Sequence, residues 1–200
     1  MKGDRVVGEP AKGMTLDLYE VGDAAQVHDL GGMYRNYQLE ELERTGQAGL
    51  GLPVATWLAT AWIRYGDERA GFVSLDVRRW ALELVYIEPA FRGRGLALLA
   101  VADIAHSRPG RLAAKTPLSP SGEALANRFG LVLAEHTPQE AARAAGQMRE
   151  LHEAIRNNCR HGKKRSGDPR KVCQRCYRAW IEENTPQIVF HHAQGMRARP

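Results

Sequence analysis

The stretch VYIEPAFRGRGLALLAVA, from Val85 to Ala102, limits the folds open to this chain more than any other part of the sequence. An apolar, strand-like segment ends at Pro89, and a turn with arginines and glycines leads into an unbroken run of helix-forming residues. A helix that begins directly after a strand and a glycine-rich turn presents unpaired backbone N–H groups at the positive end of its dipole. The stretch therefore predicts an α/β fold with a loop that binds an anionic group.

Two common nucleotide-binding loops do not match this stretch. A Walker loop needs the pattern G-x-x-x-x-G-K-[ST], which the chain lacks. A dinucleotide fingerprint needs G-x-G-x-x-G, but Leu98 stands where the third glycine after Gly93 and Gly95 would be. That fingerprint usually belongs to the first strand–helix unit of its domain, whereas several predicted strands precede this loop.

Hydrophobic periodicity and turn residues predict a mixed α/β domain around the loop. The predicted strands cover residues 14–21, 57–65, 70–77, 81–89, 111–118 and 131–137. The predicted helices cover residues 24–45, 96–107, 119–130 and 138–158, and the last is expected to be the longest helix of the chain. This order indicates a central mixed sheet flanked by helices, followed by a small Cys-rich module.

The loop closely resembles motif A of the GNAT superfamily, the Gcn5-related N-acetyltransferases. The family hallmark R/Q-x-x-G-x-G/A is matched by Arg92, Gly95 and Ala97, after a strand that ends at Ile87-Glu88-Pro89. The resemblance covers roughly residues 14–137 and implies a GNAT fold, acetyl-CoA as cosubstrate and an amine as acceptor. The activity expected from it is that of an N-acyltransferase, and the sequence does not indicate which amine accepts the acetyl group.

The resemblance also implies which residues contact the cofactor. The backbone amides of the loop would hold the pyrophosphate of coenzyme A, the main chain of the preceding strand would pair with its pantetheine arm, and a serine of the helix at 119–130 would lie near it. The residues with these implied roles are Val85, Tyr86, Ile87, Arg92, Gly93, Arg94, Gly95, Leu96, Ala97 and Ser121.

Acetyl transfer to an amine needs a base, or a water relay, that removes a proton from the nucleophile. Glu83 is the candidate base by its position on the strand before the loop, and a salt-bridged or solvated strand carboxylate is the alternative interpretation. Ala126 falls where many relatives carry a general-acid tyrosine, so a GNAT-type protein with other chemistry or none stays open. Tyr34 and Tyr37 are candidate acceptor contacts, with packing roles as the alternative.

All three cysteines of the chain fall within residues 159–176. Cys173 and Cys176 form a Cys-x-x-Cys chelating pair, and Cys159 and His161 supply two more ligands, which completes a four-coordinate zinc set. A complete set indicates a structural rather than a catalytic metal. A loop histidine is the alternative interpretation of His161, with His152 or His191 as the fourth ligand. An odd number of cysteines argues against a disulfide framework.

Charge is concentrated near the C-terminal end of the sequence. Residues 151–200 hold 11 Lys/Arg and 4 Asp/Glu, a net charge of +7, whereas residues 1–150 hold 17 and 19, a net of −2. Binding of nucleic-acid phosphates is one hypothesis for the basic run between the metal ligands, with Tyr177 and Trp180 stacking on bases. A solvated basic loop, with both aromatic side chains packed beneath the metal site, is the other.

The expected organisation is an N-terminal arm (1–13), a GNAT acyl-CoA-binding domain (14–137), a connecting helix (138–156), a zinc module (157–183) and a C-terminal tail (184–200). Neither a signal peptide nor a membrane span is expected, which favours a cytoplasmic protein. Besides an acyltransferase, two further classes stay open. They are a GNAT-fold protein that modifies or binds nucleic acid, and a non-catalytic interaction protein whose zinc module docks a partner.

Overall fold

The computed structural model describes residues 13–108, 110–159, 161 and 172–197. The chain divides into two compact units, each built from two separate stretches. Unit 1 comprises Met1–Tyr19 and Trp57–Leu133, and unit 2 comprises Glu20–Thr56 and Ala134–Pro200. The segments expected from the sequence are continuous along the chain, so their boundaries do not coincide with those of the units.

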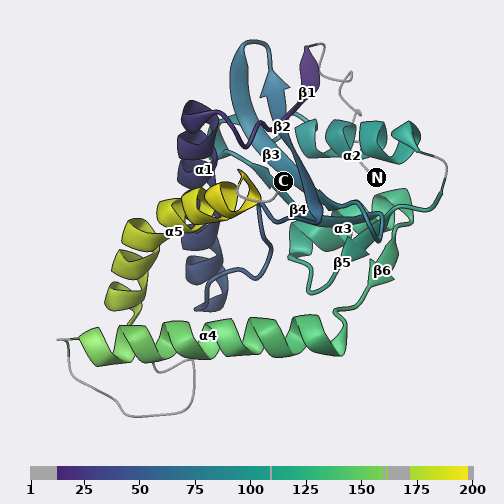
Figure 1. Ribbon diagram of the computed structural model, residues 1–200. Helices are drawn as coiled ribbons and strands as arrows, with labels where there is room; N and C mark the ends of the chain where they lie inside the picture. Colours follow the sequence, from purple (N-terminus) through teal and green to yellow (C-terminus); the bar gives the residue numbers. More distant parts are fainter. Residues whose placement is uncertain (1–12, 109, 160, 162–171, 198–200) are drawn as a thin grey trace, which may run out of the picture. The chain divides into compact units, whose positions relative to one another are not determined.

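A six-stranded mixed sheet forms unit 1 and confirms the predicted mixed α/β architecture (Figure 1). Its strands follow one another in chain order: β1 (Met14–Leu18), β2 (Leu58–Tyr65), β3 (Glu68–Asp76), β4 (Ala81–Ile87), β5 (Ala113–Lys115) and β6 (Val132–Ala134). Strands β1 to β4 are antiparallel, whereas β5 runs parallel to β4. The predicted turn between β2 and β3 is present, with Gly66 at φ +62°, a left-handed conformation that glycine adopts without strain.

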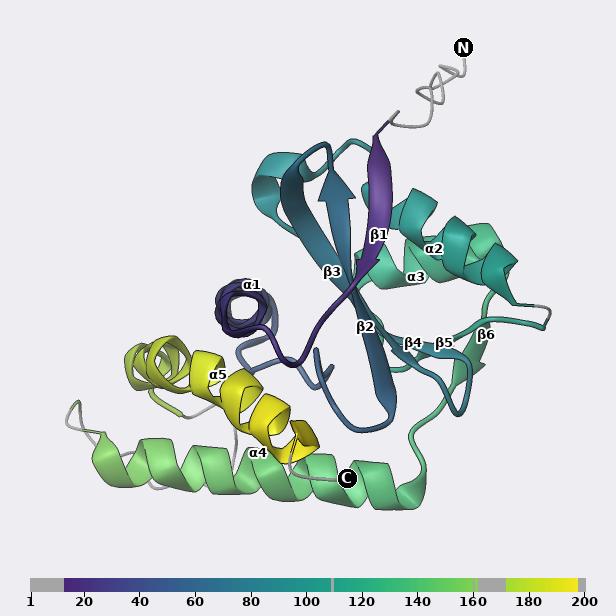
Figure 2. The same ribbon diagram turned by 45° about the horizontal axis from the view of Figure 1, so that its top comes forward.

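The helices of unit 1 are η1 (Pro89–Phe91), α2 (Leu96–Ser107) and α3 (Pro120–Phe129). Helices α2 and α3 lie beside the sheet (Figure 2), and their side chains join a single hydrophobic cluster with Ile63, Val73 and Leu82 of the strands. Because side chains alternate along a strand, Trp62, Phe72 and Tyr86 belong to the opposite face of the sheet. Unit 1 therefore builds its core between one face of the sheet and these two helices.

The described part of unit 2 contains three helices: α1 (Ala24–Thr45), α4 (Pro138–Asn158) and α5 (Gln174–Arg197). The ends of α1 and the start of α4 agree with the sequence signals. Asp23 caps α1 and Gly46 ends it in a left-handed conformation, while Thr137 and Glu140 form a capping box around Pro138. The core of unit 2 is made by Leu42, Ile155, Val172, Tyr177 and Ile181, which come from all three helices and from the segment before α5.

Helix α5 corrects two expectations. It has 24 residues against 21 in α4, so α4 is not the longest helix, and its residues 184–197 are helical rather than a tail. Pro186 lies inside α5, which bends along its length (Figure 1). A proline inside a helical pattern normally indicates that a helix ends, and the sequence analysis predicted no helix in this stretch. Gly31 of α1 leaves room for the proline, since a Cβ atom there would lie 3.1 Å from Cα of Pro186.

Candidate metal centre and anion-binding loop

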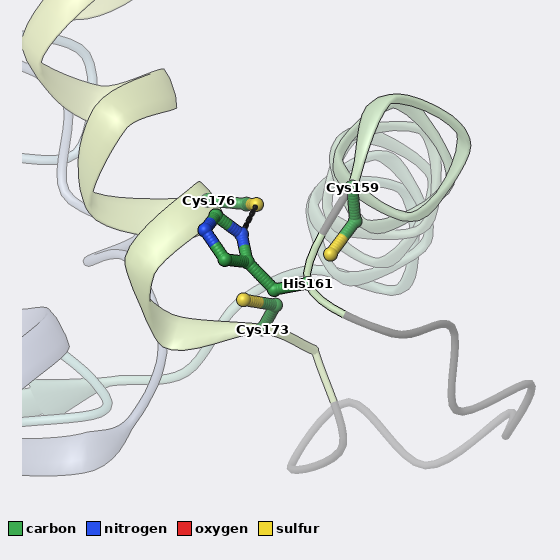
Figure 3. A group of neighbouring side chains, drawn as sticks. All are labelled: Cys159, His161, Cys173 and Cys176. Atoms are coloured by element: carbon green, nitrogen blue, oxygen red, sulfur yellow. Dashed lines mark hydrogen bonds between the residues drawn. The ribbon is translucent and has the colours of Figure 1, made fainter.

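The four predicted metal ligands converge in unit 2 (Figure 3). Cys159 is the C-cap residue of α4, and Cys173 directly precedes α5, where its carbonyl accepts the Tyr177 N–H at 2.9 Å. Cys176 lies in the first turn of α5, and His161 lies between the two helices in the chain. The three sulfur atoms and a His161 ring nitrogen all lie within 4.8 Å of one another. The site is therefore formed where the end of α4 meets the start of α5.

The chemistry of this donor set fits a metal ion such as zinc. Three thiolates and one imidazole provide a closed tetrahedral shell, and soft sulfur ligands select zinc over magnesium or calcium. His161 Nδ1 lies 3.3 Å from the Cys176 sulfur, so the histidine already faces the thiols. His152, one of the alternative ligands, instead packs its ring edge-on against Tyr177 at a centroid distance of 5.5 Å. The side chain of the other alternative, His191, lies outside the described part of the structure.

The cysteine thiols differ in acidity. The backbone N–H of Cys176 lowers the pKa of Cys173, whereas burial and hydrogen bonding with the other two thiols raise the pKa of Cys176 to about 11. Only thiolates bind a metal ion, so binding must displace the proton from Cys176. Metal affinity at this site should therefore fall as the pH falls.

In unit 1, the glycine-rich loop connects η1 to α2. Gly93 and Gly95 have φ angles of +78° and +75°, and a Cβ atom at either position would meet no other atom within 4 Å. Gly95 is the N-cap residue of α2, and no side chain accepts a hydrogen bond from the helix at that position. The first turn of α2 also contains no acidic residue. The predicted loop thus leads into a helix N-terminus whose first N–H groups donate to no capping side chain.

The two arginines of the loop rest on aromatic rings. Arg92 donates from Nε to the Ile87 carbonyl at 2.8 Å, and its guanidinium carbon lies 5.5 Å from the centre of the Tyr86 ring. Arg94 lies 5.0 Å from the Tyr65 ring and 5.7 Å from the Phe91 ring. Cation–π contacts of this kind stabilise exposed arginines by roughly 0.5–1 kcal/mol each. They keep two positive charges at the loop.

Strand β4 pairs with β5 along only a short part of its length. The paired residues are Ala81 with Ala113 and Leu82 with Ala114, and no further β5 pair exists in the described part of unit 1. The Glu88 N–H bonds to the Ala70 carbonyl on the β3 side. Because peptide groups alternate in direction along a strand, those of Val85 and Ile87 point away from β3. The edge of β4 beyond Leu82 therefore presents backbone groups that β5 does not cover.

Glu83 is part of a buried ion triad. Lys115 Nζ lies 2.7 Å from Glu83 Oε2 and 3.0 Å from Asp76 Oδ2, and all three side chains are at most 7 % exposed. Burial works against the charge of Lys115, but hydrogen bonds to Glu83 and Asp76 outweigh it and raise the pKa of the lysine. Glu83 thus forms the salt bridge that its alternative interpretation names, and it lies on β4 before the loop as predicted. The sequence did not indicate Lys115 or Asp76, and the only available signal was a lysine at the end of the apolar run LAAK.

The remaining candidates divide into packing residues and surface residues. Tyr34 is buried and donates to the Gly51 carbonyl at 3.0 Å, and Tyr37 stacks against it at 5.9 Å, so both support the chain after α1. Ala126 is buried, and Ser121 lies exposed in the first turn of α3.

The predicted nucleic-acid surface is not supported by its aromatic residues. Tyr177 is fully buried and Trp180 packs on the same cluster, so stacking of Tyr177 on a base is excluded. The basic residues of this hypothesis, Arg160, Lys163, Lys164, Arg165, Arg170 and Lys171, lie outside the described residues.

Comparison with known proteins gave no match to a family model, a curated protein or a solved structure. Within the described residues, no helix combines the length and the apolar character that crossing a membrane requires.

Proposed function

We propose that this chain is an N-acyltransferase of the GNAT type that takes acetyl-CoA as its acetyl donor. The observation that carries the proposal is the combination, in unit 1, of a glycine N-terminus on α2 that no side chain caps and a stretch of β4 that does not pair with β5. The first feature suits a pyrophosphate, and the second suits an extended chain with amide groups, such as pantetheine. One ligand with both parts explains why the two features follow each other within residues 83–97.

The loop would hold the pyrophosphate through its backbone. The N–H groups of Gly95, Leu96 and Ala97 lie at the start of α2, where the helix dipole favours negative charge by roughly 0.3–1 kcal/mol at an exposed site. Gly93 and Arg94 complete the turn, and Arg92 and Arg94 add charge. No atom lies within 4 Å of where a Cβ atom of Gly95 would be, which leaves room beside this glycine for a ligand.

The backbone of β4 would hold the pantetheine arm. Val85 is the principal residue in this role, since its peptide groups point away from β3. Ile87 points the same way, but its carbonyl already accepts a hydrogen bond from Arg92. Tyr86 faces β3 with its peptide groups, so its contribution is its ring, over which Arg92 lies.

Acetyl-CoA supplies the acetyl group as a thioester, and the protein must remove a proton from the acceptor amine. Glu83 is the proposed base, and Lys115 fixes the direction of its carboxylate by bonding Oε2. Ala126 provides no acid where many relatives of the proposed family carry a tyrosine. Transfer does not depend on that acid, because a departing thiolate needs little protonation.

The metal of the Cys₃His cluster is inferred to be zinc in a structural role. The four ligands fill a tetrahedral shell, and a catalytic zinc site would keep one position open for water or substrate. The ligands join α4 to α5 within unit 2, whereas the loop and β4 belong to unit 1. Acyl transfer is therefore not assigned to the metal.

Calorimetric titration with coenzyme A and acetyl-CoA tests the proposal. Gly95→Asp places a carboxylate where the pyrophosphate is expected and should weaken binding at least about tenfold, equivalent to about 1.4 kcal/mol. Gly130→Asp is the matched control, because Gly130 also has a positive φ, of +58°, and open space, but ends α3 instead of starting α2. The control should bind as the wild type does.

Two outcomes would contradict the proposal. The first is wild-type protein that binds neither ligand at millimolar concentration, and the second is Gly95→Asp binding with unchanged affinity. If the wild type binds acetyl-CoA, the next step is to find the acceptor. Release of free coenzyme A thiol in the presence of a panel of small amines and peptides would identify the acceptor class.

A further inference from the structure

The start of α5 combines two functions within a few residues. Cys173 and Cys176 are metal ligands, and the residues between and after them bind the end of α1 and the chain that follows it. Gln174 Nε2 donates to the Gly46 carbonyl at 3.2 Å, and Arg178 pairs with Glu43. The metal centre is therefore one helical turn from the contacts that join α5 to α1.

Tyr177, next to the ligand Cys176, makes the most deeply buried of these contacts. Its side chain is fully buried, its hydroxyl accepts the Ala48 N–H at 2.9 Å, and it donates to Met148 Sδ of α4 at 3.3 Å. A single hydroxyl thus joins α4, α5 and the chain after α1. The edge-on ring of His152 packs against the tyrosine ring.

The segment 46–51 has no helix or strand of its own and depends on side chains to hold it. From α1, Gln38 accepts the Gly49 N–H at 2.7 Å and donates to the Gly49 carbonyl at 3.1 Å, and Tyr34 binds Gly51. The ring of Tyr37 lies so close to Gly49 that a Cβ atom there would be 2.4 Å from the tyrosine oxygen. From α5, Tyr177 supplies the hydrogen bond to Ala48.

We propose that metal bound at Cys159, His161, Cys173 and Cys176 orders segment 46–51 through Tyr177, so that metal occupancy switches this segment between a fixed and a mobile state. The metal links the last residue of α4 to the first turn of α5, which holds Tyr177 between Met148 and Ala48. Without the metal, four side chains lose their common partner, and the position of Tyr177 rests only on its own hydrogen bonds and on the packing of α5. The segment then keeps its contacts to α1 and loses its contact to α5.

Hydrogen exchange measured residue by residue tests this switch. Zinc-loaded protein should contain about one equivalent of metal, and a chelator should speed exchange of the Ala48 amide about tenfold, as loss of about 1.4 kcal/mol of protection requires. Adding zinc back should restore protection. Amides of β3 in unit 1 serve as the internal reference and should not change.

Two variants distinguish the effect of the Tyr177 hydroxyl from a general increase in the mobility of segment 46–51. Tyr177→Phe keeps the ring and the metal ligands, so it should bind one equivalent of zinc and still show fast exchange at Ala48. Tyr34→Phe removes the hydrogen bond to Gly51 from the α1 side, and it should keep the zinc dependence at Ala48.

Several results would overturn the switch. The first is protein that contains no zinc as purified and binds none when zinc is added. The second is an exchange rate of the Ala48 amide that the chelator does not change. The third is zinc-dependent protection of Ala48 in Tyr177→Phe. None of these measurements uses acetyl-CoA, so their outcome does not depend on the proposed acyltransferase activity.

Discussion

Buried polar side chains in the two units are stabilised in different ways. In unit 1, Lys115 neutralises two carboxylates at hydrogen-bonding distance, and each member of the triad has a charged partner. In unit 2, His152 is 5 % exposed, and its Nε2 atom has no hydrogen-bond partner among the described residues. Burying an imidazole without a hydrogen-bond partner costs much less in its neutral form than in its charged form.

The stability of unit 2 should therefore depend on pH through His152. Burial lowers the pKa of this histidine, and Arg156 one turn away lowers it further. The unfolded chain binds a proton near pH 6.5, whereas the folded chain binds it only at lower pH. The contribution of neutral His152 is complete above pH 6.5 and is lost as the pH falls through 6.5 towards the folded pKa.

Urea unfolding between pH 7 and pH 5 measures this dependence. His152→Phe keeps an aromatic ring against Tyr177 and removes the titrating group. The free energy of unfolding of the wild type should fall more steeply than that of the variant, by at most about 1.4 kcal/mol per pH unit. Both proteins need saturating zinc, because the metal ligands also titrate. Parallel pH curves would show that His152 accepts a proton equally well in both states.

Among the elements, the contact between α1 and α5 depends on one of two adjacent glycines. Gly31 faces Pro186, with a Cβ atom at this position 3.1 Å from the proline Cα and 3.4 Å from its Cβ and carbonyl oxygen. A Cβ atom added to Gly32 would have no other atom within 4 Å. The absence of a side chain matters at Gly31 because it lets α1 approach the proline of α5.

Leucine substitution at the two glycines should separate packing from helix propensity. Gly31→Leu forces α5 away from α1 and should destabilise unit 2 by about 1–3 kcal/mol, the usual cost of overpacking. Gly32→Leu adds a better helix former and should be neutral or stabilising by up to about 1 kcal/mol. Thermal unfolding followed by circular dichroism compares them. Equal stability of both variants would mean that the helices separate without cost.

For the whole molecule, the two candidate sites belong to different compact units. The glycine loop and the part of β4 that does not pair with β5 lie in unit 1, and the cysteine cluster lies in unit 2. The excess positive charge of the sequence also falls in the stretch that contains the cluster. The candidate metal site and the basic run of the nucleic-acid hypothesis therefore both belong to the C-terminal quarter of the chain.

A proposed nucleic-acid contact in this quarter should reveal itself by its salt dependence. Released counterions make the affinity for DNA or RNA fall steeply as salt rises. Replacing Lys163, Lys164 and Arg165 together by glutamine should flatten that slope, while coenzyme A affinity should stay unchanged. Fluorescence anisotropy with labelled oligonucleotides between low and physiological salt measures both slopes. Without salt-sensitive binding by the wild type, the basic run is a solvated surface.

The sequence by itself predicted most elements and the four Cys and His residues that the structure brings together. Helix ends are set by hydrogen bonds or backbone angles that involve only neighbouring residues, as at Asp23, Gly46, Ser119 and Thr137. Cys-x-x-Cys is likewise a local arrangement, since its spacing alone brings two thiols together. Such signals survive in the sequence because the interactions behind them span only a few residues.

Only the tertiary structure decided the continuation of α5 through Pro186, the burial of Tyr177, the partners of Glu83 and the division into interleaved units. Each depends on residues far apart in the chain: Pro186 on Gly31, Tyr177 on Ala48 and Met148, Glu83 on Lys115. A single sequence shows that a residue is aromatic, charged or helix-breaking. The sequence does not show which distant residue contacts that side chain. Spacing along the chain does not determine this partner, because long-range packing brings the two residues together.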